Sequence, residues 1–334
     1  MQKDPFRTIV QIEKPLDLVT VDSGVFFIGS CFAGNIGQKM VDARFPSMVN
    51  PYGVLFNPFS VAAALESIVE HRMVSEDDLV EKDGLWHSFM HHGRFSHPDL
   101  PTAVKAINEA TETAHHFLQS AEFIIVTLGT AYVYEHKMEQ RVVANCHKFP
   151  DMDFNRYLLE PEEIIEVWKE LIVRLRVFNP SVKIIFTVSP VRHWKDGAHG
   201  NQVSKSVLFL AIDKLVHLFD KVTYFPAYEI VMDELRDYRF YDAAMLHPNG
   251  VAVDYIWQRF SQSLLSPGAN TYLKEVSKII RARHHRPSGH NTVSYHNFIQ
   301  QTLEKIFTLA RRYPAARLEE DKNWFQGVLS ELVD

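Results

Sequence analysis

The chain has 334 residues, of which 46% are hydrophobic and 23% are charged, and its formal net charge is −6. This is an ordinary globular composition with enough apolar residues for a large core. The lysines and arginines are scattered, which is not typical of a protein that binds nucleic acid or an anionic membrane. We therefore expect neither nucleic acid nor a membrane as a partner. The sequence does not indicate the oligomeric state.

The first residues carry charges and a proline where an export signal needs an apolar segment, and the apolar runs are too short to span a bilayer. The only two cysteines, Cys31 and Cys146, cannot form a disulfide framework, so we expect reduced thiols. These features predict a protein of the cytoplasm.

Short apolar runs without polar alternation predict strands that are buried on both faces. They lie at residues 25–30, near 47–50, and at 123–128, 183–188 and 222–225. Segments with a helical apolar period occur between or after them, at 160–178, 204–219 and 248–265. This alternation predicts an α/β domain with a mostly parallel sheet of five strands.

Two further segments predict inserted β-hairpins, residues 79–89, with Asp83-Gly84 at the turn, and residues 131–147. Helical patterns return at 269–283 and 292–312, joined by HHRPSGHN. We expect residues 1–265 to form the sheet domain and residues 266–334 a helical appendage packed on it.

Ligands of an open α/β sheet bind beyond the carboxyl ends of its strands. Polar clusters follow the predicted strands in turn: Gly29-Ser30-Cys31, NPYGVLFNP (50–58), Gly129-Thr130, SPVRHWKDG (189–197) and YDAAMLHPNG (241–250). Because these clusters share one predicted edge, we expect an active-site rim there.

Ser30 and Cys31 each allow two interpretations. Ser30 can be the N-cap of the following helix, and Cys31 can be a small buried apolar residue. Alternatively, the helix N-terminus lowers the pKa of Cys31, or a nearby histidine activates Ser30 or Cys31. The turn could also direct backbone N–H groups at an oxyanion.

His247 lies in a loop directly before a proline, where it could act as a general base, and Asp242 could orient it. Both could equally be surface residues. Arg192, His193 and Trp194 share one loop, which suits an anionic or sugar-like ligand but equally suits contacts within the protein. The chain has no Cys-x-x-Cys pair and no Gly-x-Gly-x-x-Gly motif, so we expect no metal and no cofactor.

Residues 27–33, FIGSCFA, resemble the motif that names the GSCFA domain family. Further segments resemble that family's blocks in the same order: NPYGVLFNP, TLGTAYVY, ANCHKFP, SPVRHWKDGAHGNQVSKSVL and LHPN…YIW. The resemblance covers about residues 5–260. The family is placed in the SGNH (GDSL-like) hydrolase superfamily, which implies a flavodoxin-like three-layer α/β/α fold and ester hydrolysis or acyl transfer.

The superfamily has a serine nucleophile in a Gly-Asp-Ser turn, oxyanion donors from that turn and two later blocks, and an Asp-x-x-His pair. By this resemblance Cys31 occupies the nucleophile position and Ser30 the aspartate position. His247 matches the base, whereas the expected aspartate is Ala244, and Asp242 is the nearest acid.

The implied oxyanion donors are the Cys31 amide and Gly53 of the second block. The third block reads Gly129-Thr130-Ala131 and lacks the expected asparagine, so Thr130 or Asn50 would replace it. The resemblance implies that Gly129 lies in the substrate site.

These features predict an esterase or acyltransferase that acts on a small-molecule or carbohydrate O-acyl ester. Cys31 or Ser30 would form the acyl-enzyme, and His247 would be the general base and then the general acid. Arg192, His193 and Trp194 would shape its acceptor pocket. The alternative is a non-catalytic ligand-binding protein with an incomplete triad. A third hypothesis is a thiol-redox role of Cys31 with Cys146, which requires the two sulfurs to approach bonding distance.

Overall fold

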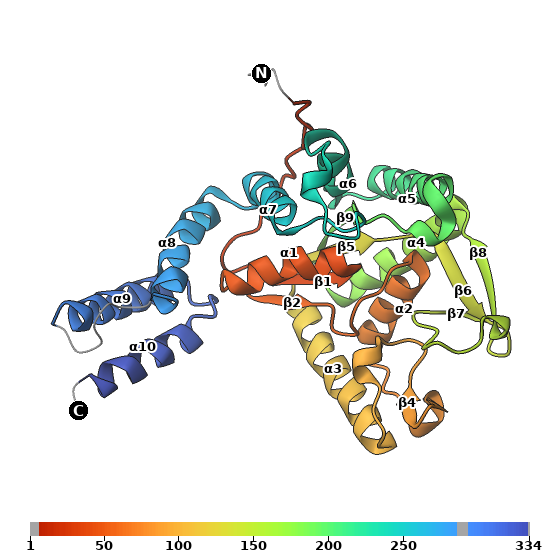
Figure 1. The fold of residues 1–334 in the computed structure, drawn as a ribbon, viewed down its shortest axis with the longest axis horizontal. Helices are drawn as coiled ribbons and strands as arrows, with labels where there is room; N and C mark the ends of the chain where they lie inside the picture. The colour runs from red at the N-terminus through yellow and green to blue at the C-terminus, as the bar shows by residue number, and fades with distance from the viewer. Residues whose placement is uncertain (1–6, 286–292, 333–334) are drawn as a thin grey trace.

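The computed structural model describes residues 7–285 and 293–332, and its centre is a sheet of five parallel strands (Figure 1). The strand order is β10-β9-β5-β1-β2. The strands are β1 (Val25–Gly29), β2 (Ser47–Val49), β5 (Phe123–Leu128), β9 (Lys183–Val188) and β10 (Val222–Tyr224). The predicted α/β class and all five predicted strands are confirmed.

The middle strands are apolar throughout because both faces of the sheet are covered. In β1 every residue is buried, and Phe26 and Ile28 face one side while Val25 and Phe27 face the other. One face is covered by α2 (Pro58–Val69), α3 (Leu100–Ser120), α4 (Pro161–Phe178) and α5 (Gly197–Leu218). The other is covered by α1 (Cys31–Asp42), α6 (Ala227–Glu229) and α7 (Gly250–Leu264).

The strand order is that of flavodoxin-like folds, and it places the topological switch point between β1 and β5. From β1 the chain moves outward to β2 and then returns across β1 to β5. These two central strands pair in parallel from Val25 with Phe123 to Gly29 with Thr127. The loops after β1 and β5 therefore diverge around a crevice at the carboxyl edge.

Some helices differ from the sequence prediction. The helix expected from residue 204 begins at Gly197, and the 21-residue helix α3 was not predicted. The buried stripe of α3 consists mostly of small or polar residues, which gives a weak apolar signal: Ala103, Ile107, Thr111, Ala114 and Leu118.

The first predicted hairpin is confirmed as β3 (Val80–Lys82) and β4 (Leu85–His87), joined at Asp83 and Gly84, which both have positive φ. The second predicted hairpin, β6 (Tyr132–His136) with β7 (Arg141–Val143), is part of a larger sheet. A third strand, β8 (Phe154–Leu158), pairs with the other edge of β6.

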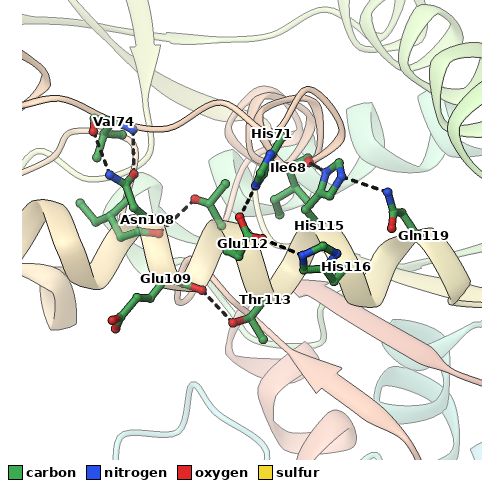
Figure 2. A network of polar contacts seen from close by, with 12 residues as sticks. Ile68, His71, Val74, Asn108, Glu109, Glu112, Thr113, His115, His116 and Gln119 are labelled. Carbon is green, nitrogen blue, oxygen red and sulfur yellow. Dashed lines mark hydrogen bonds and ion pairs between the residues drawn. The ribbon is translucent and has the colours of Figure 1, made fainter.

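Polar contacts join the end of α2 to α3 (Figure 2). Glu112 accepts hydrogen bonds from His71, at 2.5 Å, and from His116, at 2.6 Å. The ring of His115 stacks on His71 and bonds the Ile68 carbonyl at 2.8 Å. This network ties the end of α2 to the C-terminal half of α3.

The C-terminal helices are α8 (Pro267–Arg283), α9 (Val293–Arg312) and α10 (Glu319–Glu331). They lie beyond α1 and α7, on the opposite side of the molecule from β6–β8 (Figure 1). Most of the predicted junction HHRPSGHN lies outside the described residues, and α10 was not predicted. The apolar residues of α8, α9 and α10 join the same hydrophobic cluster as α1 and α7.

A buried carboxylate connects α10 to the end of α1. Asp321 is fully buried and accepts hydrogen bonds from Arg44 at 2.5 and 2.9 Å and from Arg283 at 3.2 Å. The Arg317 amide also donates to the Arg44 carbonyl at 2.8 Å. Within residues 7–285 and 293–332, no helix is long and apolar enough to cross a membrane.

Candidate active site

The turn after β1 can be formed only with glycine at position 29. Gly29 has φ 132°, and a Cβ there would lie 2.1 Å from the Thr127 carbonyl oxygen. The next residue, Ser30, donates its N–H to the same carbonyl at 3.0 Å and accepts the Phe32 N–H on Oγ at 3.3 Å. Ser30 is therefore the buried N-cap of α1, and its hydroxyl is engaged in that role.

Cys31 is the first residue of α1 and carries a partly buried free thiol. Burial raises the pKa of this thiol, against the opposing effects of the Phe32 and Cys31 amides and the charge of Lys205. Cys146 is also free, and burial raises its pKa to about 11. No disulfide joins the two cysteines, so the structure lends no support to the thiol-redox hypothesis.

The loop after β2 brings a carboxamide to the β1 turn. Asn50 has φ 46°, and its Oδ1 accepts the Gly29 N–H at 2.9 Å, which fixes Nδ2 as the donor end. That Nδ2 lies 3.7 Å from the position that a Cβ on Gly34 would occupy, beside the first turn of α1. It has no hydrogen-bond acceptor among the described residues, so Asn50 offers a free N–H donor near Cys31.

Gly53 has a structural role in the same loop. Its φ is 83°, and a Cβ there would lie 2.1 Å from the Cβ of His92. The Gly53 N–H donates to the Asn50 carbonyl at 2.8 Å. Because this amide closes a turn, the structure does not direct it at an oxyanion, contrary to the prediction.

The predicted contribution of Thr130 also differs from the structure. The N–H groups of Gly129 and Thr130 both donate to the Phe56 carbonyl, at 2.7 and 3.2 Å. The Thr130 hydroxyl lies 3.0 Å from the Ser204 Oγ. These groups hold the loop after β5 against α5 and the β2 loop, so Thr130 is not an oxyanion donor here.

His247 lies beside Asp242, although four residues separate them in the chain. Met245 has φ 61°, and the Asp242 N–H donates to the His247 carbonyl at 2.8 Å, so the loop folds back on itself. The His247 Nδ1 lies 3.4 Å from the Asp242 Oδ2. Asp242 thus occupies the place beside the imidazole that the sequence pattern assigns to Ala244, which is exposed.

The His247 loop shares the rim with the loop after β9, because the Arg192 N–H donates to the Leu246 carbonyl at 3.2 Å. The His247 side chain is 50% exposed. Among the described residues it makes no hydrogen bond to Ser30 or Cys31. The structure therefore places His247 on the rim but not hydrogen-bonded to either candidate nucleophile.

A cavity of about 490 Å³ opens beside this rim. Arg192 and Trp194 line it, with the Arg192 guanidinium 5.6 Å from the centre of the Trp194 ring. The Arg192 Nε is buried without a hydrogen-bond partner in the described part of the chain. The rest of the lining comes from the segments at 231–238 and 241–246, including Tyr238 and Tyr241.

His193 is partly buried and does not line this cavity. Its Nε2 is buried without a partner among the described residues, 3.1 Å from the position of a Cβ on Gly129. Burial, and then the charge of Lys205, lower the pKa of His193 to about 4, so its ring is neutral near pH 7. The predicted loop residues thus divide, with Arg192 and Trp194 at the cavity and His193 beside Gly129.

Lys205 was missed by the sequence analysis. It is 1% exposed, and its Nζ donates to the Gly129 carbonyl at 2.7 Å and the Ser189 carbonyl at 2.6 Å. A signal was present in the sequence, because Lys205 shares the buried stripe of α5 with Ser204, Leu208 and Ile212. A lysine on such a stripe is rarely buried without a special environment.

No group of three or more histidine, cysteine, aspartate or glutamate side chains in residues 7–285 and 293–332 is arranged to hold a metal ion. The candidate site therefore consists of the Cys31 turn, the Asn50 donor, the His247–Asp242 pair and the cavity at Arg192. All four lie at the carboxyl edge of the sheet.

The sequence matches the GSCFA family over residues 24–260. Residues 276–331 match the C-terminal domain of GSCFA domain proteins. No curated protein matches the chain. Among solved structures, an acetyl xylan esterase from the rumen bacterium Butyrivibrio proteoclasticus is similar at 14% identity and a TM-score of 0.35. The similarity covers 72% of this chain and 64% of that one, which is less than two thirds of its length. Since the first match extends over more than half of the sequence, the chain belongs to the GSCFA family.

Proposed function

We propose that this protein is an esterase or O-acyltransferase that forms a thioester on Cys31. The observation that carries the proposal is the position of Cys31 at the topological switch point, where it begins α1 and follows the turn to which Asn50 is hydrogen-bonded. The Cys31 amide is in the first turn of α1, where N–H groups have no acceptor within the helix. The second donor is the Nδ2 of Asn50. Together they would stabilise the oxyanion that forms when the sulfur attacks an ester carbonyl.

In the first step the Cys31 sulfur, as the thiolate, bonds to the carbonyl carbon, and the bond between that carbon and the ester oxygen breaks. The leaving oxygen takes a proton from protonated His247. In the second step, neutral His247 takes a proton from water or from an acceptor hydroxyl, whose oxygen attacks the thioester. The bond between the carbonyl carbon and the sulfur then breaks and releases the Cys31 thiolate. Water gives hydrolysis, and an acceptor hydroxyl gives acyl transfer.

The His247–Asp242 pair suits these proton transfers at the rim. Asp242 holds the Nδ1 side of the ring, which leaves the other nitrogen for the substrate oxygen. Desolvation opposes the negative charge of Asp242, but hydrogen bonds from the His247 and Leu246 amides outweigh it and lower the pKa of Asp242. The carboxylate is therefore ionised near pH 7, when it stabilises a protonated His247.

The cavity at Arg192 would hold the alcohol part of the ester. Its exposed aromatic ring, Trp194, and its unpaired guanidinium suit a carbohydrate that carries a negative charge. The proposal of ester chemistry at Cys31 does not depend on this substrate class, which is a more specific proposal.

The test measures turnover of p-nitrophenyl acetate and traps the acyl-enzyme for intact-protein mass spectrometry. We expect Cys31→Ala to abolish both turnover and the acetyl adduct, and His247→Ala to slow release of the adduct. Cys146→Ser is the matched thiol control and should retain activity. Ser30→Gly, which removes the hydroxyl from an N-cap, should retain the adduct with a modest loss of stability.

A wild-type protein that neither turns over esters nor acquires the adduct would reject the catalytic proposal. The binding-protein alternative would then be favoured, since no hydrogen bond joins His247 to Cys31 among the described residues. Acetylated sugars that bind with unchanged affinity in Cys31→Ala would support that alternative.

A further inference from the structure

Lys205 is a buried cation without a carboxylate partner. It extends from α5 beneath the loops after β5 and β9, and no salt bridge within the described residues includes it. A buried ammonium usually has a paired anion, because removal of an isolated charge from water is costly. The absence of such a partner indicates that this amine spends part of its time neutral.

Two hydrogen bonds orient the amine. Its Nζ donates to the carbonyls of Gly129 and Ser189, which follow the ends of the adjacent strands β5 and β9. A neutral amine has two N–H groups and one lone pair. When both N–H groups bond these carbonyls, the lone pair remains available as a base.

Four side chains, on three different segments of the chain, interact with Lys205. Arg192 and His193 lie on the loop after β9, and the Tyr228 ring centre is 5.9 Å from Nζ. Cys31 lies at the start of α1 and interacts electrostatically with Lys205. Arg192 disfavours the ammonium, whereas an ionised Cys31 stabilises it.

The backbone places the side chains of Cys31 and Lys205 at the same crevice. The Ser30 N–H bonds to the Thr127 carbonyl at 3.0 Å, so Cys31 follows β1 directly beside the end of β5. Gly129, whose carbonyl holds Lys205, comes two residues after Thr127.

We propose that Lys205 is the base that takes the proton from the Cys31 thiol, while His247 serves the substrate oxygens. This assignment rests on Cys31 as the nucleophile of the proposed function. The amine lone pair accepts the thiol proton, giving an ammonium and a thiolate. When the thioester is cleaved, the released thiolate takes that proton back, so Lys205 returns to the neutral amine.

The titration of both groups is consistent with this exchange. Burial, and then Arg192, lower the pKa of Lys205 to about 7, whereas burial raises the pKa of Cys31. A base with a pKa near the working pH is the most effective for proton transfer. The Cys31 thiol needs such a base because its own ionisation is disfavoured.

The first experiment measures alkylation of Cys31 by iodoacetamide between pH 5 and pH 10, in a Cys146→Ser background, without any ester. Lys205→Gln should slow alkylation at pH 7.5 by about tenfold or more and shift the pH midpoint upward by about one unit. Lys195→Gln, at an exposed lysine of the same rim, is the matched control and should react at the parental rate. His247→Ala should also react at that rate.

Alkylation of Lys205→Gln at the parental rate, or an equal loss in His247→Ala, would overturn the assignment. The assay also separates the two proposals. If alkylation of Cys31 depends on Lys205 but the protein turns over no ester, the assignment of Lys205 as the base holds and the proposed function is rejected. If the protein turns over esters but Lys205→Gln is alkylated at the parental rate, the proposed function holds and the role of Lys205 as the base is rejected.

A second measurement keeps the test valid if Lys205→Gln does not fold. In the wild-type protein with ¹³C-labelled lysine, one Cε resonance should titrate with a midpoint near 7 and shift when Cys31 is alkylated. In Cys31→Ala its midpoint should fall, because the stabilising anion is gone. If every lysine resonance titrates above about pH 9, as unperturbed lysines do, Lys205 is a permanent cation and the proposal is wrong.

Discussion

The Oδ1 of Asn50 accepts the N–H of Gly29 at 2.9 Å, which joins the loop after β2 to the turn that carries Cys31. This single bond both orients the free Nδ2 and satisfies a buried amide of the turn. Arg94 supports the loop from outside by donating to the Asn50 carbonyl at 2.9 Å. The position of the proposed oxyanion donor therefore depends on two loops that are distant in sequence.

Asn50→Ala is expected to destabilise the protein by about 2–5 kcal/mol. The change leaves the buried Gly29 N–H unpaired, at about 1–3 kcal/mol, and puts alanine at positive φ, at about 1–2 kcal/mol. Asn50→Gly should lose only the first contribution, because glycine accepts φ 46°. Urea unfolding of both variants measures the difference, and equal losses would contradict the backbone argument. Both should lower kcat for ester turnover.

Gly53→Ala should be more destabilising than Gly84→Ala. Both glycines have positive φ, but a Cβ at Gly53 meets His92 at 2.1 Å, whereas Gly84 has nothing within 4 Å. We expect about 1–2 kcal/mol for Gly84→Ala from backbone strain, and at least about 2 kcal/mol more for Gly53→Ala from the collision. Thermal unfolding of the pair checks this, and similar midpoints would show that the loop relaxes freely.

Stability should rise with pH between about 7 and 10 because of Lys205. In this window the unfolded lysine holds a proton that the folded protein has released, since its folded pKa is lowered to about 7. The slope contributed by one group is at most about 1.4 kcal/mol per pH unit. Chemical unfolding of wild type and Lys205→Met across this range should show the rise in the wild type relative to the variant. Parallel curves would contradict the lowered pKa.

Acid should destabilise the protein below about pH 6.5, in part through His91. Its Nδ1 lies 2.8 Å from the Ser88 Oγ, and burial, then the charge of His147, lower its pKa to about 4. Between the ordinary histidine pKa of about 6.5 and the folded pKa of about 4, the unfolded state binds a proton that the folded state does not. Stability therefore falls as pH falls through this range. His91→Phe should flatten the decline between pH 6.5 and 4, measured by urea unfolding. If the variant loses stability in acid as steeply as wild type, His91 is not the cause of the acid destabilisation.

Arg192→Gln should selectively impair turnover of anionic sugar esters. Loss of a charge-assisted contact of about 1.5–3 kcal/mol corresponds to at least about a tenfold fall in kcat/KM. Acetate release from acetylated glucuronic acid and acetylated glucose gives the comparison, and Arg192→Lys is the control that keeps the charge. Equal losses on both esters would mean that Arg192 supports the loop rather than the substrate.

The central sheet was predictable because its strands are apolar on both faces and are separated by clear helical stripes. The predictions failed where burial is slight. The helix α10 buries only Asp321 and Phe325, so its sequence resembles that of an exposed segment. Strand β8 has only Phe154 buried, which leaves little apolar pattern to recognise.

The site was predictable where a residue's role depends on its local sequence. The N-cap at Ser30 was foreseen as one of two interpretations. The donor roles of Gly53 and Thr130 failed because the partners of their loops come from elsewhere, such as the Phe56 carbonyl that takes both amides after β5. The identity of such partners depends on tertiary contacts, which no spacing in a single sequence reveals.

The fully buried Asp321, with Arg44 and Arg283 around it, has a consequence for the order of events during synthesis. The sheet and the helices on its α2–α5 face consist of residues that the ribosome makes first. The apolar surface of α1 and α7 obtains its last cover, including Phe325, only when α10 has been translated. The nascent chain must therefore keep that surface from aggregating until α10 has been synthesised, which makes this step the natural point for chaperone assistance.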